Sequence, residues 1–235
     1  MEIIPEKDVG TKGVGILGGT FDPIHLGHLR AAEEAGEGLH LEKVYLIPSA
    51  QPPHKCNKYV APFADRLRMT RLAVMNAPRL DVLDLEGKRR GFSYSIQTLK
   101  ELDAALCSEI YFIVGVDAFL DITTWKEYRS LFDYAHFVVI QRPGFNLNNI
   151  YEFTSKIDIK FKRKNASDTI LQAPSGKTLI LFNTTLMDIS STIIRKKVAS
   201  KKSIRFLIPD RVRDYIVEKG LYLNFDDPVK SRVDG

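Results

Sequence analysis

One short segment near the amino end combines residue types that suit phosphate chemistry. It is the run Gly18-Gly19-Thr20-Phe21-Asp22-Pro23-Ile24-His25-Leu26-Gly27-His28. Glycines let the backbone approach an anion closely, and the start of a helix offers N–H groups that have no partner within the helix. His25 and His28 are three residues apart, so on a first helical turn their imidazoles project to one side. There they can donate hydrogen bonds to a polyphosphate. The segment therefore predicts a phosphate-binding site.

Other interpretations of this segment stay open when the residues are considered alone. Its glycine spacing does not fit the GxGxxG dinucleotide motif, and the Gly-Lys-Ser/Thr of a Walker A loop is missing. Two histidines at this spacing could bind zinc, but no third ligand is obvious. Gly-Gly and Pro are also ordinary turn residues, so a purely structural turn is a further alternative.

The elements that must position this segment alternate between apolar strands and helical stretches. Six apolar runs are expected to form strands: Val14–Leu17, Val44–Ile47, Asp81–Leu85, Ile110–Val114, Phe137–Ile140 and Lys177–Phe182. Helices are expected at Leu26–Leu39, after Pro62, at Ser93–Leu106 and from Ser190. Continuous apolar strands suit a sheet that is covered on both faces. The order predicts an α/β fold with a doubly wound, mostly parallel sheet, in which ligands bind at the carboxyl ends of the strands.

The chain is expected to hold one domain. Residues 14–224 carry the alternating pattern, residues 1–13 form a leader, and residues 225–235 form a loose tail. The stretch near 145–176 is rich in Asn and Lys and poor in apolar residues, so it is expected to be an irregular insertion.

Composition excludes several protein classes. The chain has 235 residues, of which 44% are hydrophobic, enough to fill a core and to exclude disorder for most of its length. With 34 basic and 29 acidic residues the net charge is 34 − 29 = +5, which suits a protein that handles phosphates without demanding nucleic acid. The basic pairs Lys196-Lys197 and Lys201-Lys202 have no aromatic residues within them, which argues against a nucleic-acid surface.

The compartment is inferred from what the sequence lacks. The two cysteines, Cys56 and Cys107, lie 51 positions apart and form no disulfide framework. The first 13 residues carry no apolar signal core, and no apolar run approaches the ~18 residues of a membrane span. A cytoplasmic protein without a membrane partner is expected.

Several motifs together resemble a known family. The run GGTFDPIHLGHL looks like the signature of the HxGH nucleotidyltransferases, and the run ISSTIIR at 189–195 resembles the second phosphate motif of that superfamily. Further segments resemble the bacterial nicotinate-nucleotide adenylyltransferases: Pro48–Lys55, Ser93–Ser95, Gly115–Asp117 with Trp125, Gln141–Gly144 and Ser203–Asp210. The match covers about residues 14 to 224 in the right order. HxGH alone would identify only the superfamily, whereas the combination is specific for this family.

The resemblance implies a reaction and a Rossmann-like nucleotidyltransferase fold. ATP and nicotinate mononucleotide would give nicotinate adenine dinucleotide and pyrophosphate in NAD biosynthesis. Because the attacking phosphate is already anionic, no catalytic base is needed, and catalysis would rest on positioning and charge stabilisation. Mg²⁺ would accompany ATP, and no separate protein metal site is expected. The oligomeric state is left open.

The resemblance also assigns roles to residues on the ATP side. His25, His28 and Arg195 would be catalytic, and an Arg at such a helix position would otherwise be solvated. Asp117 would bind a ribose hydroxyl or help place the cation, with Val116 in place of the usual Ala. The full ATP-binding set is Gly18, Gly19, Thr20, Phe21, His25, His28, Gly115, Asp117, Ile189, Ser190, Ser191, Thr192 and Arg195.

A second set would hold the mononucleotide: Lys55, Ser93, Tyr94, Ser95, Trp125 and Arg142, with His54 beside Lys55 on the Pro-rich loop. Trp125, the sole tryptophan, would stack on the pyridine ring, although a core position is the competing interpretation. Ser95 stands where the family often has Thr; it keeps the hydroxyl for the contact to the pyridine carboxylate and lacks the methyl group. The run Lys88-Arg89-Arg90 is better interpreted as a solvated charge run than as part of the site.

Alternatives of several classes accompany this interpretation. The same chemistry could prefer nicotinamide mononucleotide, whose amide is neutral. Another HxGH enzyme, such as a pantetheine-phosphate adenylyltransferase, would lack the context of Trp125 and Arg142. A nucleotide-binding regulator without turnover would need a damaged site, whereas His25, His28 and Arg195 are all present.

Overall fold

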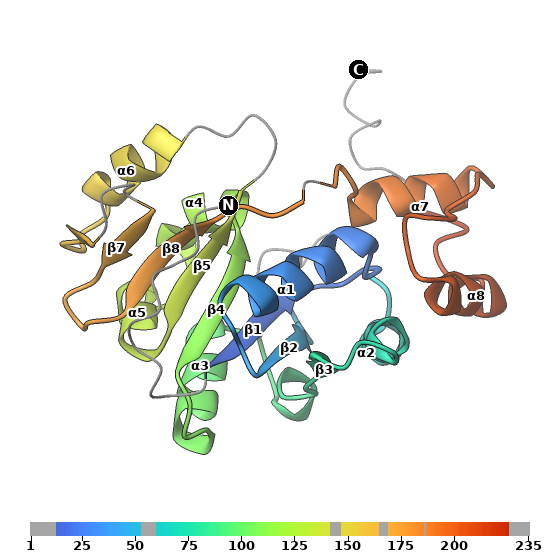
Figure 1. Ribbon diagram of the computed structural model, residues 1–235. Helices are drawn as coiled ribbons and strands as arrows, with labels where there is room; N and C mark the ends of the chain where they lie inside the picture. Colours follow the sequence, from blue (N-terminus) through green and yellow to red (C-terminus); the bar gives the residue numbers. More distant parts are fainter. Residues whose placement is uncertain (1–12, 53–59, 142–146, 165–168, 186, 226–235) are drawn as a thin grey trace, which may run out of the picture.

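The computed structural model of the chain describes residues 13–52, 60–141, 147–164, 169–185 and 187–225. Within these ranges the strands form one eight-stranded sheet in the order β3-β2-β1-β4-β5-β8-β7-β6 (Figure 1). The strands are β1 (Val14–Gly19), β2 (Lys43–Pro48), β3 (Leu80–Val82), β4 (Ile110–Gly115), β5 (His136–Ile140), β6 (Lys162–Arg163), β7 (Ile170–Gln172) and β8 (Thr178–Phe182). Pairing is parallel from β3 to β8 and antiparallel only at β7 and β6, which confirms the predicted mostly parallel sheet.

Helices cover both faces of this sheet. They are α1 (Leu26–Gly38), α2 (Phe63–Val74), α3 (Ser95–Ala105), α4 (Val116–Leu120), α5 (Leu131–Tyr134), α6 (Leu147–Lys156), α7 (Ser191–Ala199) and α8 (Asp210–Lys219). Short 3₁₀ turns lie at Glu86–Lys88, Ile122–Thr124 and Tyr128–Ser130. One buried cluster joins α3, α4 and α5 to the sheet, and a second joins α1, α2, α7 and α8 to it. The helices therefore divide into two layers with the sheet between them.

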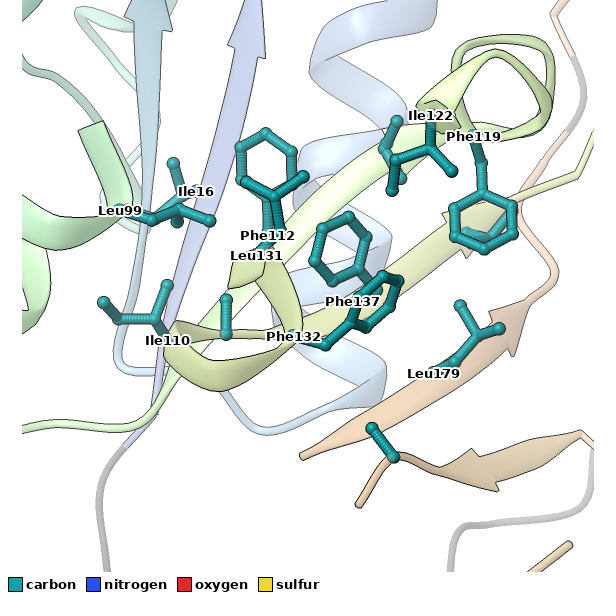
Figure 2. Close-up of a cluster of buried hydrophobic side chains, with 14 of the residues drawn as sticks. Ile16, Leu99, Ile110, Phe112, Phe119, Ile122, Leu131, Phe132, Phe137 and Leu179 are labelled. Atoms are coloured by element: carbon teal, nitrogen blue, oxygen red, sulfur yellow. The ribbon is translucent and has the colours of Figure 1, made fainter. Parts of the chain in front are cut away.

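Alternation along the central strand shows how one sequence serves both layers. In β4, Phe112 and Val114 belong to the first cluster, and Ile113 between them belongs to the second. This follows from the two-residue period of a strand, which sends successive side chains to opposite faces. The aromatic rings of the first cluster are drawn in Figure 2, where Phe132 stacks on Phe137 with 4.4 Å between ring centroids. Burying each ring of this kind stabilises the fold by roughly 1.5–3 kcal/mol.

The sheet has a switch point between β1 and β4. From β1 the chain proceeds outward through β2 to β3, and from β4 it proceeds the other way through β5 to β8. Loops that leave the carboxyl ends of β1 and β4 therefore diverge, and in open α/β sheets ligands bind at such a switch point. Strand β1 ends at Gly19 and is followed by the turn at residues 20–23, and β4 ends at Gly115, directly before α4.

The stretch near 145–176 differs from the expectation of an irregular insertion. It holds helix α6 and the two antiparallel strands β6 and β7, which extend the sheet beyond β8. Several of its few apolar residues occupy buried positions, namely Ile150, Ile157 and Leu171. The Lys-rich and Asn-rich composition obscured this spacing, because most other described side chains of the stretch face solvent.

Element boundaries shift slightly from their predicted positions. The expected strand at Asp81–Leu85 is Leu80–Val82, and the helix expected from Ser93 begins at Ser95, so that Ser93 and Tyr94 precede it. The expected leader and tail fall almost wholly outside the described residues. The exception in the tail is Phe225, which packs against the second cluster and is not loose. Among the described residues, none of the helices has the length and apolar character needed to cross a bilayer.

Candidate active site

The turn after β1 is held tightly by a glycine and a buried ring. Phe21 is 2% exposed and has a φ of 48°, in the left-handed region. A Cβ atom on Gly19 would lie 2.8 Å from the Phe21 ring, closer than real Cβ contacts. Gly18 is exposed, and the turn continues through Thr20 toward α1. The second glycine is therefore required by packing, while the first leaves the backbone open at the carboxyl end of the strand.

The two histidines meet at the start of α1. Their rings stack with 3.6 Å between centroids and 26° between planes. The main-chain N–H of His25, the residue that caps the helix, donates to Nδ1 of His28 at 3.3 Å. The edge of Phe21 also meets the His28 ring, at 5.1 Å between centroids. The spacing of three residues thus brings both imidazoles to one side, as predicted.

Gly27 provides room for the first of these rings. A Cβ atom on Gly27 would lie 3.1 Å from Nδ1 of His25, so a side chain there would press on the imidazole. His25 itself is 6% exposed, whereas His28 is half-buried. The glycine between the histidines therefore acts through packing, which the motif alone did not explain.

One main-chain N–H group at the start of α1, which was expected to bind an anion, already donates to another part of the protein. The N–H of Leu26, the first residue of α1, donates to the carbonyl of Leu207 at 3.0 Å. The helix start is therefore tied to the segment before α8, and less of the anion-binding capacity comes from its main chain than the sequence suggested. The side chains of His25 and His28 gain importance accordingly.

Helix α7 lies against the turn after β1. Ser190 caps it, with Oγ accepting from the N–H of Ile193 at 3.2 Å, as expected for a Ser at this position. Ser191 Oγ donates to the carbonyl of Pro23 at 2.8 Å. Two sequence motifs almost 170 positions apart are thereby joined at one place. Ile189, which precedes the cap, is half-buried and packs on the second cluster.

Arg195 is fixed from several sides. Its Nη1 donates to the main-chain carbonyl of Asp22 at 2.6 Å, and its Nη2 donates to Oγ1 of Thr192 at 3.2 Å. The guanidinium also lies over the ring of Phe225, 4.5 Å from its centroid. Its buried Nε has no hydrogen-bond partner among the described residues. Arg195 is thus not a solvated surface residue, and it faces the same turn as Ser191.

Three of the residues predicted to bind the mononucleotide, Ser93, Tyr94 and Ser95, lie at the start of α3. Ser93 Oγ accepts from the N–H groups of Ala50 and Gln51 at 3.0 and 3.1 Å, and thereby holds the loop after β2. Lys126 Nζ lies 4.8 Å from the centroid of the Tyr94 ring, so the residue beside Trp125 reaches the start of α3. Ser95 begins the helix and is half-buried.

Trp125 lies at the edge of the core, and its stacking on a pyridine ring stays a prediction. It is half-buried, packs on the first cluster, and meets Phe112 edge to face at 6.3 Å between centroids and 85° between planes.

At the end of β4, the other strand of the switch point, Gly115 caps α4, and a Cβ atom there would meet nothing within 4 Å. Asp117 follows within the first turn of α4 and is exposed.

Some predicted residues cannot be placed, and some important ones were missed. His54, Lys55 and Arg142 lie outside the described residues. Arg89, from the basic run that was expected to be solvated, is instead half-buried and donates to Glu101 and Thr98 of α3. Three buried polar residues that the motifs did not single out hold the site together: Asp22, Arg66 and Tyr222.

The missed residues form connected hydrogen bonds beneath the turn. Asp22 Oδ1 accepts from the Tyr222 hydroxyl at 2.8 Å and from the N–H of Ala61 at 3.2 Å. Arg66 is 1% exposed, and its burial lowers the pKa of the guanidinium while the charge of Asp22 opposes that change. The sequence offered one sign of this role: Arg66 stands among the apolar positions of α2. An Arg at such a position is buried only when its donors have partners.

The described residues form no metal cage. No group of three or more His, Cys, Asp or Glu side chains among them is placed to hold a metal ion. The site offers instead two imidazoles, a guanidinium, helix-start hydroxyls and an aromatic ring, a set that suits an anionic nucleotide and a flat base.

Comparisons with known proteins agree with this geometry. Residues 16–197 match the family model described as cytidylyltransferase-like. A relative from Citrifermentans bemidjiense, named "Probable nicotinate-nucleotide adenylyltransferase", is 44% identical over 213 residues, which cover 90% of this chain and 98% of the relative. A relative of the same name from Desulfatibacillum aliphaticivorans is 43% identical and covers 89% of this chain and 99% of its own length.

A solved structure matches the fold at lower identity. The nicotinic acid mononucleotide adenylyltransferase of Plasmodium falciparum complexed with NaAD superposes with a TM-score of 0.70 at 21% identity, covering 90% of this chain and 97% of that one. The order of elements, the two phosphate-side motifs and the high identity to full-length relatives agree. The chain therefore belongs to the cytidylyltransferase-like family and, within it, to the nicotinate-nucleotide adenylyltransferases.

Proposed function

We propose that this chain transfers the adenylyl group of ATP to nicotinate mononucleotide in NAD biosynthesis, at the site around His25, His28 and Arg195. The observation that carries the proposal is the meeting of two distant motifs. Ser191 and Arg195 of α7 bond to the main chain of the same turn that presents the stacked histidines. Relatives that are 44% and 43% identical over nearly their full length are named for this activity.

The bonds that change can be stated for this reaction. An oxygen of the mononucleotide phosphate forms a bond to the α-phosphorus of ATP. The bond from that phosphorus to the oxygen it shares with the β-phosphate breaks, and pyrophosphate leaves with the electron pair. The nucleophile is already anionic, so the protein supplies alignment and charge stabilisation and needs no base.

The residues around the turn after β1 would bind the triphosphate. His25 and His28 would donate to its oxygens from one side of α1, and Arg195 would present its guanidinium from α7. Thr20, the Phe21 amide, Ser190, Ser191 and Thr192 would line the same cradle, with Gly18, Gly19, Gly115, Asp117 and Ile189 around the nucleoside. Arg195 is already oriented by Asp22, so little ordering is left for the moment of binding.

A divalent cation, which we assign as Mg²⁺, would arrive with ATP. Because the described residues form no group of three metal ligands, its partners would be phosphate oxygens, water and at most a carboxylate such as Asp117. It would neutralise part of the triphosphate charge.

The pyridine end would lie against Trp125 and the start of α3. The indole of Trp125 would stack on the ring, and Ser93, Tyr94 and Ser95 would contact its carboxylate. Ser93 Oγ accepts two loop amides, so its O–H is the part left to donate. Lys55 and Arg142 would add positive charge for the carboxylate and the phosphate.

The test compares two mononucleotides that differ in one group. The protein is mixed with ATP, Mg²⁺ and either nicotinate or nicotinamide mononucleotide, and pyrophosphate release is followed. Faster release with the acid supports the proposal, and faster release with the amide overturns the acid preference alone. No release with either overturns the reaction and leaves a nucleotide-binding regulator. EDTA in a parallel arm should stop turnover without changing the melting temperature of the ligand-free protein.

A further inference from the structure

Arg66 is a buried charged residue, and none of its contacts is of the kind expected of a residue that binds substrate. It belongs to α2, is 1% exposed, and lies below the turn after β1. Burying a guanidinium is costly unless its donors are satisfied. Every hydrogen bond that its side chain donates goes to a main-chain carbonyl, and the guanidinium also lies over the ring of Phe63 in its own helix, 5.5 Å from the centroid.

These carbonyls come from both halves of the site. One nitrogen, Nη1, donates to the carbonyl of Thr20 and to that of Ser49, each at 2.7 Å. The second, Nη2, donates to Ala50 at 3.1 Å, and Nε donates to Ala61 at 2.9 Å. The first carbonyl belongs to the turn after β1, and the next two belong to the loop after β2. A single planar group therefore spans the two loops.

The second loop connects onward to the residues proposed for the pyridine end. Ser93 Oγ accepts from the N–H groups of Ala50 and Gln51, and the Ser93 N–H donates to the carbonyl of Gln51 at 2.9 Å. A continuous set of bonds thus runs from Thr20 through Arg66 to Ser93. Thr20 is on the ATP side of the proposed site, and Ser93 is on the mononucleotide side.

We propose that Arg66 is a positioning residue that sets the distance and angle between the two substrates. The assignment rests on the proposed function, because it requires one substrate on each loop. Transfer to phosphorus needs the attacking oxygen in line with the leaving oxygen, and a displacement near 1 Å costs about 10²-fold in rate. Arg66 touches neither substrate, so its loss should lower kcat far more than it weakens the binding of either one.

The planar fork should matter as well as the charge. Lysine carries the same charge, but its single nitrogen can at best replace Nη1, and it leaves unmade the bonds that Nη2 and Nε donate to Ala50 and Ala61. Arg66→Lys should therefore be intermediate between the wild type and Arg66→Met.

The experiment measures kcat, KM for each substrate and the thermal melt of four variants. Arg66→Met should lose about 10²-fold in kcat, and Arg66→Lys about tenfold, with each KM changed by less than about threefold. Arg68→Met removes an exposed Arg from the same helix and should leave kcat unchanged. Met69→Ala opens a cavity at a fully buried neighbour and controls for lost stability.

Each outcome decides the assignment. A kcat for Arg66→Lys equal to that of the wild type, or no lower than that of Met69→Ala at a matched melting temperature, overturns it. A loss that falls on one KM alone also overturns it, because that result marks a ligand of one substrate. If Arg66→Met does not fold, the same criteria are applied to Arg66→Lys. A wild-type protein that releases no pyrophosphate defeats the proposed function itself, which is distinguishable from an active wild type with an unaffected Arg66 variant.

Discussion

The guanidinium of Arg195 lies 3.6 Å from the Asp22 carboxylate and donates through Nη1 to the Asp22 main-chain carbonyl at 2.6 Å. One residue comes from the turn after β1, and the other comes from α7 near the end of the described chain. The contact orients a cation at the proposed phosphate site before any substrate binds. Preorganised charge of this kind costs no reorganisation during the reaction.

Replacement of Arg195 by Lys should lower turnover while the fold persists. The charge remains, but the fork that spans Asp22 and a phosphate is lost, so kcat should drop by about 10- to 100-fold. Pyrophosphate release at saturating substrates measures it. Lys202→Ala, at an exposed position after α7, is the control and should match the wild type. Unchanged turnover in Arg195→Lys would remove the guanidinium from the reaction.

Replacement of His28 by Ala should affect catalysis much more than stability. The loss of a donor to the developing charge should reduce kcat by roughly 10²- to 10³-fold. The bond from the His25 N–H to Nδ1 is also lost, which should cost about 1 kcal/mol of helix capping. Turnover and chemical denaturation are measured on the same preparation. His40→Asn, at an exposed residue with a φ of 52°, is the control. Near-normal turnover with a cooperative melt would exclude His28 from the site.

Replacement of Tyr222 by Phe should destabilise the protein by about 1–3 kcal/mol, because the buried Asp22 carboxylate loses a hydroxyl donor. Urea unfolding measures the change. Tyr215→Phe is the matched control on the neighbouring helix α8, where the hydroxyl donates to the half-buried Asp65 at 2.7 Å. Its loss should be smaller, since water can replace the donor. Equal unfolding midpoints for Tyr222→Phe and the wild type would contradict the importance of this bond.

The single tryptophan makes mononucleotide binding visible. If Trp125 stacks on the pyridine ring, titration with nicotinate mononucleotide should quench its emission. Trp125→Leu should raise KM for that substrate by about 5- to 150-fold, from a stacking energy of about 1–3 kcal/mol, and leave KM for ATP unchanged. An increase in the KM for ATP of the same size would mean that the change disturbs the fold around Phe112 instead.

A polar cluster of Glu109, His136 and Lys177 at the amino-terminal ends of β4, β5 and β8 should make stability depend on pH. Burial lowers the pKa of His136, the charge of Lys177 lowers it further, and Glu109 opposes both. The unfolded chain therefore binds a proton on this group at a higher pH than the folded one. The stabilising contribution is present above the unfolded value near 6.5 and is lost as the pH falls toward the lower folded value, by at most ~1.4 kcal/mol per pH unit.

Urea unfolding at pH 7.5 and pH 5.5 measures this effect, with His136→Gln as the comparison. The wild type should lose more stability between the two values than the variant does. Turnover at pH 7.5 should be the same in both, because His136 begins β5, far along the strand from the carboxyl end where the site lies. An equal loss in both proteins would assign the pH dependence to other groups.

Local patterns predicted much of this fold. Apolar runs predicted the six parallel strands and the helices α1, α2, α3 and α7, and most of the predicted ends lie within two residues of the observed ones, because hydrophobic periodicity is set by the geometry of each element alone. They did not predict α4, α5 or α8. The spacing of His25 and His28 likewise placed two rings on one side of α1. The motif resemblance indicated the family, which the comparisons confirm.

Composition gave a wrong expectation for the stretch in which only a few apolar residues are buried. Near 145–176, only residues such as Ile150 and Leu171 turn inward, and the charged majority concealed α6 and the β6–β7 hairpin. A strand or helix needs one buried face, so counting apolar residues over a whole stretch underestimates its order.

What the sequence determined by itself was the six strands of the parallel part of the sheet, the helices α1, α2, α3 and α7, the phosphate-side motif and the chemistry that its side chains permit. What only the tertiary structure decided was which distant groups meet. Arg66 of α2 bonds to carbonyls of two loops, and Tyr222 near the described end of the chain bonds to Asp22 near its beginning. Such contacts depend on how layers pack across the sheet, and no local pattern encodes the partner of a buried polar group until the fold has brought it there.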